Sequence, residues 1–267
     1  WERYSRDIEA FVNQNKSWLP DYALFMALKR SNGMKAWTEW PDEDIRLRRP
    51  GAVERYRNEL AEDVRLFTYI QYQFFRQWEA LRSFAREKGI SLIGDLPIYV
   101  PLDSVDVWTD PELYQLDETL TPTAVAGCPP DAFTADGQLW GNPLYDWEYH
   151  KKTGYSWWIK RLESAMKLYD TVRIDHFRGF ESYYAIPYGN ETAEIGEWRK
   201  GPNTDLFEKA EKALGNMSII AEDLGLITDE VREMLKNCGY PGMKVLQFAF
   251  DSGSSCGDLP HNFANSS

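Results

Sequence analysis

One ten-residue stretch, TVRIDHFRGF at residues 171–180, combines the apolar residues of a buried strand with a high density of charge. Arg173, Asp175 and His176 all lie within it. Because an unpaired buried charge costs several kcal/mol, packing alone does not explain this pattern. In a strand, Arg173 and Asp175 project to the same face, so the cation can keep Asp175 ionised, as a nucleophile requires.

A second carboxylate, Glu222, directly follows the apolar residues 219–221. An apolar approach of this kind raises the pKa of a carboxyl group, which suits a general acid. Two carboxylates, one ionised and one protonated, are the equipment of glycoside cleavage. Two structural alternatives stay open: Arg173 and Asp175 could form a structural ion pair, and Glu222 with Asp223 could be an acidic pair at a helix start.

A long segment at 127–147, GCPPDAFTADGQLWGNPLYDW, is rich in proline and glycine and displays Asp131, Gln138 and Trp140. Fixed turn chemistry over such a length is more typical of a binding loop than of a simple connection. The alternative is an Ω-loop packed on its own aromatic residues.

The elements that position these residues follow from the periodicity of apolar residues. Between residues 53 and 85 they recur at steps of three and four, which predicts one long helix within a helical region at 1–90. Beyond it we predict strands at 91–100, 171–175, 218–223 and 244–250, helices at 155–169, 204–214 and 228–238, and a long loop region at 101–153. Thr204 and Thr228 are the expected N-caps of the last two helices.

Repeated helix-then-strand units imply a parallel sheet, either a barrel or a doubly wound sheet. Asp95, Asp175, Glu222 and Asp251 each lie within or just after one of four successive strands. Only in a (β/α)₈ barrel would the carboxyl ends of all four strands converge on one face. No G-x-G-x-x-G or Walker sequence follows a strand. The pattern therefore favours the barrel.

Composition narrows the function further. A net charge of −12 over 267 residues argues against a nucleic-acid partner, and eleven Trp with fifteen Tyr mildly favour carbohydrate. The three Cys and three His are too scattered for a disulfide framework or a metal site, and His150 is expected at the surface. With no signal peptide and no apolar run of membrane length, we expect a cytoplasmic protein. A G-x-S-x-G match at 253–257 is followed by loop-like residues, which disfavours a serine hydrolase.

With these motifs assembled, the chain resembles the 4-α-glucanotransferases, or amylomaltases, of glycoside hydrolase family 77, relatives of the α-amylase barrel family. The motifs that carry the resemblance occur in the family's order at 94–108, 127–147, 172–180, 219–225, 240–250 and 259–263. The resemblance implies a retaining, two-step transfer between α-1,4-glucans or maltooligosaccharides, with no cofactor, no catalytic metal and no nucleic-acid or membrane partner.

The resemblance also implies a role for each site residue. Asp175 matches the nucleophile that forms a β-glucosyl ester, and Glu222 matches the acid/base. Arg173 and His176 match residues that orient the nucleophile and bind the donor sugar. The remaining matches are Asp131, Gln138 and Trp140 on the loop over the donor and acceptor sites, and Phe248 near the acceptor side.

The chain departs from the family pattern at both ends. The family's third carboxylate, in a T-H-D-N motif, and its first barrel strands, with a serine-proline-tyrosine motif, are absent from residues 1–267. We therefore expect a central fragment of the barrel, with a helical subdomain at 1–90 and a partial catalytic barrel at 91–267, that neither closes a barrel nor catalyses transfer alone. A hydrolase with the same carboxylates and a non-catalytic glucan-binding protein remain alternatives.

Overall fold

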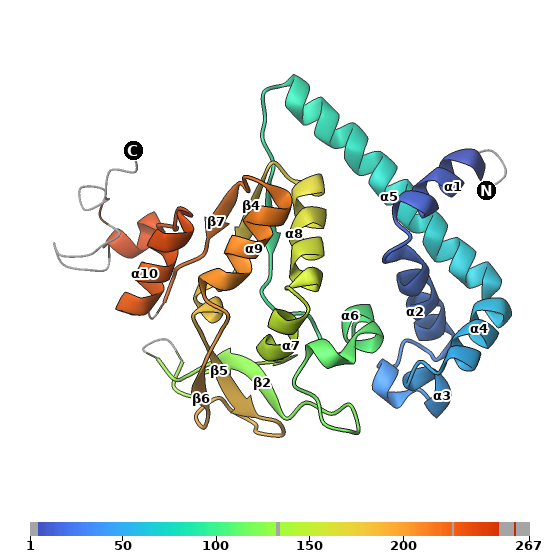
Figure 1. Cartoon of the computed structure of the whole chain (residues 1–267), viewed down its shortest axis with the longest axis horizontal. Helices are drawn as coiled ribbons and strands as arrows, with labels where there is room; N and C mark the ends of the chain where they lie inside the picture. Colours follow the sequence, from blue (N-terminus) through green and yellow to red (C-terminus); the bar gives the residue numbers. More distant parts are fainter. Residues whose placement is uncertain (1–4, 132–133, 226, 251–258, 260–267) are drawn as a thin grey trace. The chain divides into compact units, whose positions relative to one another are not determined.

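The computed structural model describes residues 5–131, 134–225, 227–250 and 259, and the chain has a mixed α/β architecture (Figure 1). It divides into two compact units. Unit 1 contains residues 1–90, 100–123 and 141–143, and unit 2 contains residues 91–99, 124–140 and 144–267. The chain thus crosses between the units more than once.

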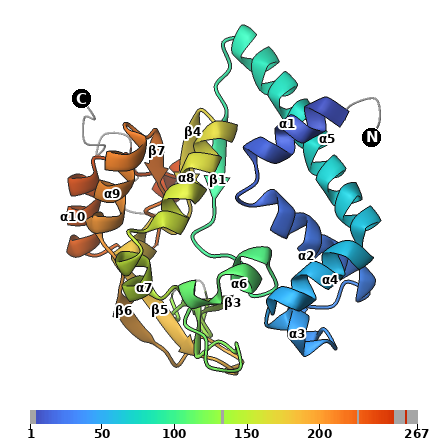
Figure 2. The same cartoon turned by 45° about the vertical axis from the view of Figure 1, so that its right-hand side comes forward.

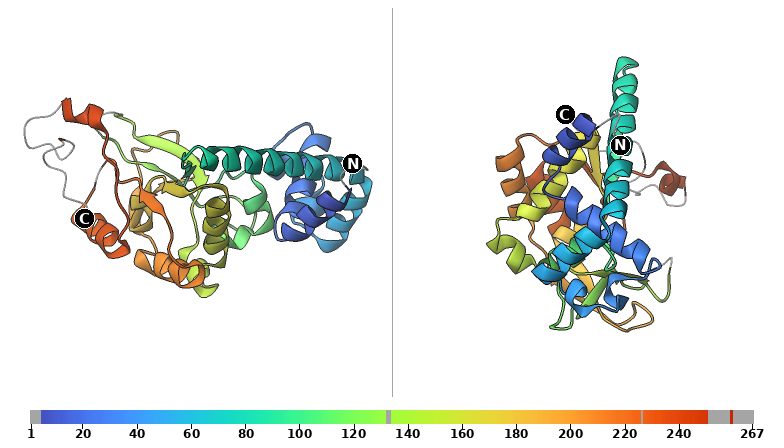
Figure 3. Two further views of the ribbon diagram at one scale, coloured as in Figure 1. Left: turned by 90° about the horizontal axis from the view of Figure 1, so that it is seen from above. Right: turned by 90° about the vertical axis from the view of Figure 1, so that its right-hand side faces the viewer.

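Unit 1 is helical. Its helices are α1 (Ser5–Gln14), α2 (Leu19–Ser31), α3 (Glu43–Arg46), α4 (Pro50–Glu59), α5 (Ala61–Glu87) and α6 (Val105–Thr109), with 3₁₀ turns η2 (Trp37–Glu39) and η3 (Pro111–Leu113). The teal helix α5 is the long straight helix in Figure 3. No helix in the described ranges is both long and apolar enough to cross a membrane.

The single helix predicted between residues 53 and 85 is wrong, because it is interrupted. Leu60 leaves helical geometry, with φ −102° and ψ 23°, and separates α4 from α5. Glu62 and Asp63 lie in the first turn of α5, where negative charge favours a helix N-terminus. The apolar periodicity continues across the break, so it gave no sign of the new helix start.

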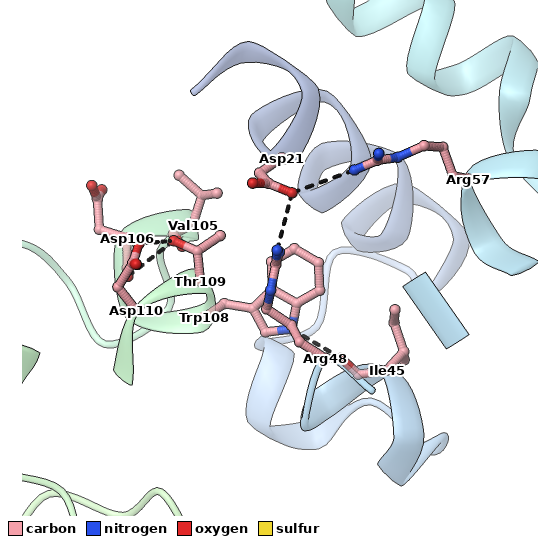
Figure 4. Close-up of polar contacts among 9 residues, drawn as sticks. All are labelled: Asp21, Ile45, Arg48, Arg57, Val105, Asp106, Trp108, Thr109 and Asp110. Carbon is pink, nitrogen blue, oxygen red and sulfur yellow. Dashed lines mark hydrogen bonds and ion pairs between the residues drawn. The ribbon is translucent and has the colours of Figure 1, made fainter. Parts of the chain in front are cut away.

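A tryptophan cluster forms the core of unit 1. Trp40 and Trp108 are almost fully buried, with ring centroids 5.7 Å apart, and the indole N–H of Trp108 donates to the Ile45 carbonyl at 3.0 Å. The Arg48 guanidinium lies 4.4 Å from the centre of the Trp108 ring and donates to Asp21 at 3.1 Å (Figure 4). The loop before α4 is thus tied to both α2 and α6.

Unit 2 contains a parallel sheet, as the helix-then-strand pattern predicts. Its strands are β1 (Ile93–Leu96), β4 (Thr171–Ile174) and β7 (Ile219–Ala221), in that order. Helices α8 (Ser156–Leu168), α9 (Thr204–Leu214) and α10 (Asp229–Cys238) accompany it. Helix α8 packs on β1, β4 and α9, and α9 lies beside α10 (Figure 2).

A second sheet takes two of its strands, β2 and β3, from the region that we predicted as loop. Its order is β3 (Gln138–Pro143), β2 (Ala124–Cys128), β5 (Ser182–Pro187) and β6 (Glu197–Lys200), with β2 and β6 antiparallel to β5. Helices α6 and α7 (Trp147–Lys152) also lie within residues 101–153. The prediction was wrong because β2 is stabilised by pairing with β5, a partner distant in sequence that local turn chemistry does not reveal.

Three further expectations need correction. Strand β1 is shorter than predicted, since Pro97 lacks the N–H that would continue the ladder. Residues 244–250 do not form a strand: Leu246–Phe250 is a 3₁₀ helix, η5, because an apolar run specifies burial but not a ladder partner. His150 is fully buried rather than at the surface, since the rings of Tyr145 and Trp147 lie 5.2 and 5.3 Å from its own.

The helix caps agree only in part with the sequence. Thr228 caps α10 as predicted, with its hydroxyl accepting the Val231 N–H. The cap of α9 is Asn203 rather than Thr204, because the Asn203 side chain accepts the Thr204 N–H at 2.8 Å. Both residue types are good N-caps, so adjacent candidates are not distinguished by type.

The close approach of β1 to Tyr169 gives a test of this sheet. A Cβ added to Gly94 would lie 2.0 Å from Cδ2 of the Tyr169 ring. We expect Gly94→Ala to lower the free energy of unfolding by about 1–3 kcal/mol through overpacking, measured by chemical denaturation. Gly51→Ala is the control, because nothing lies within 4 Å of its added Cβ and alanine favours helix α4. Equal stabilities of the two variants would contradict the packing described here.

Candidate active site

The two candidate carboxylates leave neighbouring parallel strands. Strands β4 and β7 pair with Ile174 opposite Ala221, and Asp175 and Glu222 are the next residues on each strand. The Glu222 N–H donates to the Ile174 carbonyl at 3.0 Å, which extends the pairing to the end of both strands. The sheet therefore delivers both carboxylates to the same edge, as expected for parallel strands.

Arg173 is the centre of a cluster of charges. Its Nη2 lies 2.9 Å from Oδ1 of Asp175, and its Nη1 lies 2.5 Å from Oδ1 of Asp95. Its Nε lies 3.0 Å from Sδ of Met243. Burial alone would lower the pKa of Arg173, but the hydrogen bonds and charges of the two carboxylates raise it. The guanidinium is therefore a permanent cation, with Asp175 held against it.

Glu222 is buried, with 8% of its surface exposed. Its Oε2 accepts the His176 N–H at 2.8 Å, and its Oε1 accepts the Leu224 N–H at 2.7 Å. Burial raises the pKa of Glu222 and the charge of Asp175 adds to the effect, against the lowering by these two N–H groups and by Arg173. Glu222 keeps its proton to higher pH than an ordinary glutamate, which is the property that a general acid needs.

His176 occupies a strained backbone position just after β4 and before the 3₁₀ helix η4 (Phe177–Phe180). Its backbone has φ +51°, a left-handed conformation that non-glycine residues rarely adopt. Its ring and the Trp140 ring form a T-shaped pair, with 4.8 Å between centroids and 89° between planes. Burial, together with the nearby Arg178 guanidinium, lowers the pKa of His176 to about 4. The ring is neutral near pH 7 and can both donate and accept a hydrogen bond.

The second arginine of the opening stretch has a different role. Arg178 is 5% exposed, donates to the Ser182 hydroxyl at 3.0 Å and lies 3.9 Å from the centre of the Trp198 ring. These contacts tie the segment after β4 to β5 and β6 of the second sheet. Of the two arginines, Arg173 contacts the candidate carboxylates, whereas Arg178 anchors the segment after β4 to the second sheet.

The loop residues predicted from the sequence are placed as follows. Gln138 and Trp140 lie on β3, where the Gln138 Oε1 accepts the Trp140 indole N–H at 3.1 Å. Trp140 also packs on Tyr99, and its contact with His176 brings β3 to the carboxylates. Asp131 is exposed and accepts the Thr134 N–H at 2.9 Å. Phe248 belongs to η5, but its side chain lies outside the described residues.

Two residues to which the sequence analysis gave no role join the site. Asp95 had a signal, because it lies in a strand beside the other carboxylates, and the register places it opposite Arg173. Met243 had no such signal, since nothing in its sequence context suggests a contact with Arg173. Asp251, the fourth predicted carboxylate, lies outside the described residues. Within the part of the chain that the structure describes, no group of three or more metal-ligating side chains could hold a metal ion.

The low pKa of His176 can be measured directly. We expect its ring to titrate at about 4, whereas the unfolded chain takes up the same proton near pH 6.5. The contribution of His176 to stability is then fully present above about pH 6.5 and is lost as the pH falls toward 4. Histidine NMR titration, with the resonance assigned by its loss in His176→Gln, tests this. Titration near pH 6.5 would refute it.

Comparisons with known proteins give a consistent result. The model of a family described as 4-alpha-glucanotransferase matches residues 2–267. A 4-alpha-glucanotransferase of Clostridium butyricum is 50% identical over 263 residues, which cover 97% of this chain and 54% of that protein. One of Streptococcus pneumoniae is 51% identical over 256 residues, which cover 96% of this chain and 51% of that protein.

A solved structure is also similar. The amylomaltase from Streptococcus agalactiae in complex with acarbose is 45% identical, with a TM-score of 0.95, and the match covers 99% of this chain and 53% of that one. The chain thus spans about half the length of the relatives it matches.

Proposed function

This chain belongs to the 4-alpha-glucanotransferase family, and from that premise we propose that the complete protein transfers segments of α-1,4-glucans to the 4-hydroxyl of glucose or a maltooligosaccharide. The observation that carries the proposal is the pair Asp175 and Glu222 at the ends of two adjacent parallel strands, one ion-paired and one buried. The relative from Streptococcus agalactiae, solved with acarbose, supports a carbohydrate ligand.

The reaction we propose is a retaining double displacement. Asp175 attacks the anomeric carbon of the donor while Glu222 protonates the leaving sugar, which leaves a β-glucosyl ester on Asp175. Glu222 then takes the proton of the acceptor hydroxyl as it displaces the ester. The different surroundings of the two carboxylates support this division, because Arg173 holds Asp175 and burial favours the protonated form of Glu222.

The remaining site residues complete the proposal. His176 and Arg173 orient the nucleophile and bind the donor sugar, and Trp140 offers an aromatic face beside them. Gln138 orients Trp140 through its hydrogen bond. Asp131 and Phe248 remain proposed contacts over the donor and acceptor sites. The same proposal includes a helical subdomain at 1–90, a partial (β/α)₈ barrel at 91–267, no cofactor and a cytoplasmic location.

A hydrolase with the same two carboxylates is the alternative, since water could accept the glucosyl group in place of a sugar. The product ladder from maltotriose and the complete protein separates the two functions. Transfer gives glucose together with chains longer than the donor. Glucose and maltose alone would establish hydrolysis and refute the transferase proposal.

Asp175→Asn tests the nucleophile in the complete protein. The amide cannot form the glycosyl ester, so we expect turnover of maltotriose to fall by at least about a thousandfold. The ion pair with Arg173 would also be lost, so a thermal denaturation control must accompany the rate. Turnover within tenfold of the wild type would show that the nucleophile assignment is wrong.

Glu222→Gln tests the acid. We expect it to abolish cleavage of maltotriose while it spares the single-turnover release of fluoride from glucosyl fluoride, whose leaving group needs no protonation. The later attack of the acceptor, for which Glu222 is the base, is slowed for both donors. The two donors are assayed side by side with the same acceptor. Equal losses of leaving-group release from the two donors would count against the acid role. They would point instead to a structural effect, the loss of the hydrogen bonds that Glu222 accepts from two backbone N–H groups.

A further inference from the structure

Residues 241–243 are fixed to the end of β7 at two points. The Ala221 N–H donates to the Pro241 carbonyl at 2.9 Å, and the Met243 N–H donates to Oδ1 of Asp223 at 2.7 Å. Asp223 is the residue after Glu222, so one turn of chain carries the proposed acid and the anchor of this segment. The proposed reaction gives Asp223 no role of its own.

Gly242 lets this anchor form. A Cβ added to Gly242 would lie 2.4 Å from Oδ2 and 2.7 Å from Cγ of Asp223. The carboxylate of Asp223 thus lies directly against the Cα of residue 242, a distance that any larger residue would forbid. The position of Met243 is therefore determined by backbone and carboxylate contacts rather than by loose packing.

The side chain of Met243 completes the surroundings of Arg173. Its Sδ lies 3.0 Å from Nε, while Asp95 and Asp175 bind the two terminal nitrogens. Asp95 and Asp175 are both well exposed, with 63% and 47% of their side chains accessible, so neither is held rigidly by burial. Met243 thus supplies the contact of the third nitrogen, Nε. A thioether is a weak, neutral acceptor and does not compete with Asp175 for the positive charge.

We propose that Met243, anchored by Asp223 across Gly242, is a positioning residue whose thioether holds the Arg173 guanidinium in the orientation that binds the nucleophile Asp175. The inference rests on the proposed function, because it assigns Asp175 the nucleophilic role. Its consequence is that Met243 acts on the chemical step through Arg173 without itself contacting the substrate.

Two substitutions separate this role from packing. Met243→Leu keeps apolar volume but removes the acceptor, and Met243→Gln keeps an unbranched chain with an acceptor oxygen. If the contact positions Arg173, the leucine variant loses about fivefold to tenfold in kcat with KM within about twofold, and the glutamine variant retains more of the rate. If Met243 only fills space, the order is reversed, because leucine is the better apolar replacement.

The assay uses the complete protein with maltotriose, and thermal denaturation accompanies each variant. Met234→Leu is the matched control, since Met234 is buried in α10 and is expected to leave kcat unchanged. Gly242→Ala should reproduce the loss of Met243→Leu by displacing Asp223. The proposal would be overturned if Met243→Leu kept the wild-type kcat, or if Met243→Gln had a lower kcat than Met243→Leu. A wild-type protein without transfer would instead refute the proposed function.

Discussion

The site depends on one constraint, the need to compensate a partly buried cation on the central strand of a parallel sheet. The Arg173 guanidinium is held by Asp95 of β1, by Asp175 after β4 and by Met243 in the segment before η5. Each contact comes from a different segment, so the charge of Arg173 is compensated only when Asp95 and Asp175 have both come into place, and Met243 adds a neutral third contact. Because removing one partner of a partly buried ion pair is costly, this requirement couples the ends of β1 and β4 to the fold.

The same sheet gives two chemically equivalent carboxylates different surroundings. Asp175 projects toward solvent against a cation, whereas Glu222 is enclosed and accepts two backbone N–H groups. The difference arises from position rather than from residue type, since Asp175 lies against a guanidinium and the burial of Glu222 raises its pKa. Neighbouring parallel strands are suited to this arrangement, because their ends lie side by side while the connecting segments vary.

The segment after β4 shows how support and chemistry share one stretch of chain. His176 takes up a left-handed conformation, and its N–H donates to Glu222. Strained backbone of this kind is commonly found at functional sites. Arg178 secures this turn by its contacts with Ser182 and Trp198 of the second sheet. The same turn includes Gly179. A Cβ added there would lie 2.7 Å from Cδ1 of Ile98, so close packing favours a residue without a side chain.

The sequence by itself determined what local chemistry can specify. It placed α9 at 204–214, the Thr228 cap of α10, and Asp175 and Glu222 at the ends of two strands, since caps, periodicity and strand polarity are written within a few residues. The tertiary structure alone decided the pairing of β2 with β5, the 3₁₀ conformation of 246–250 and the contact of Met243 with Arg173. These features depend on partners far away in the chain, and a neighbour brought close only by folding leaves no trace in local sequence.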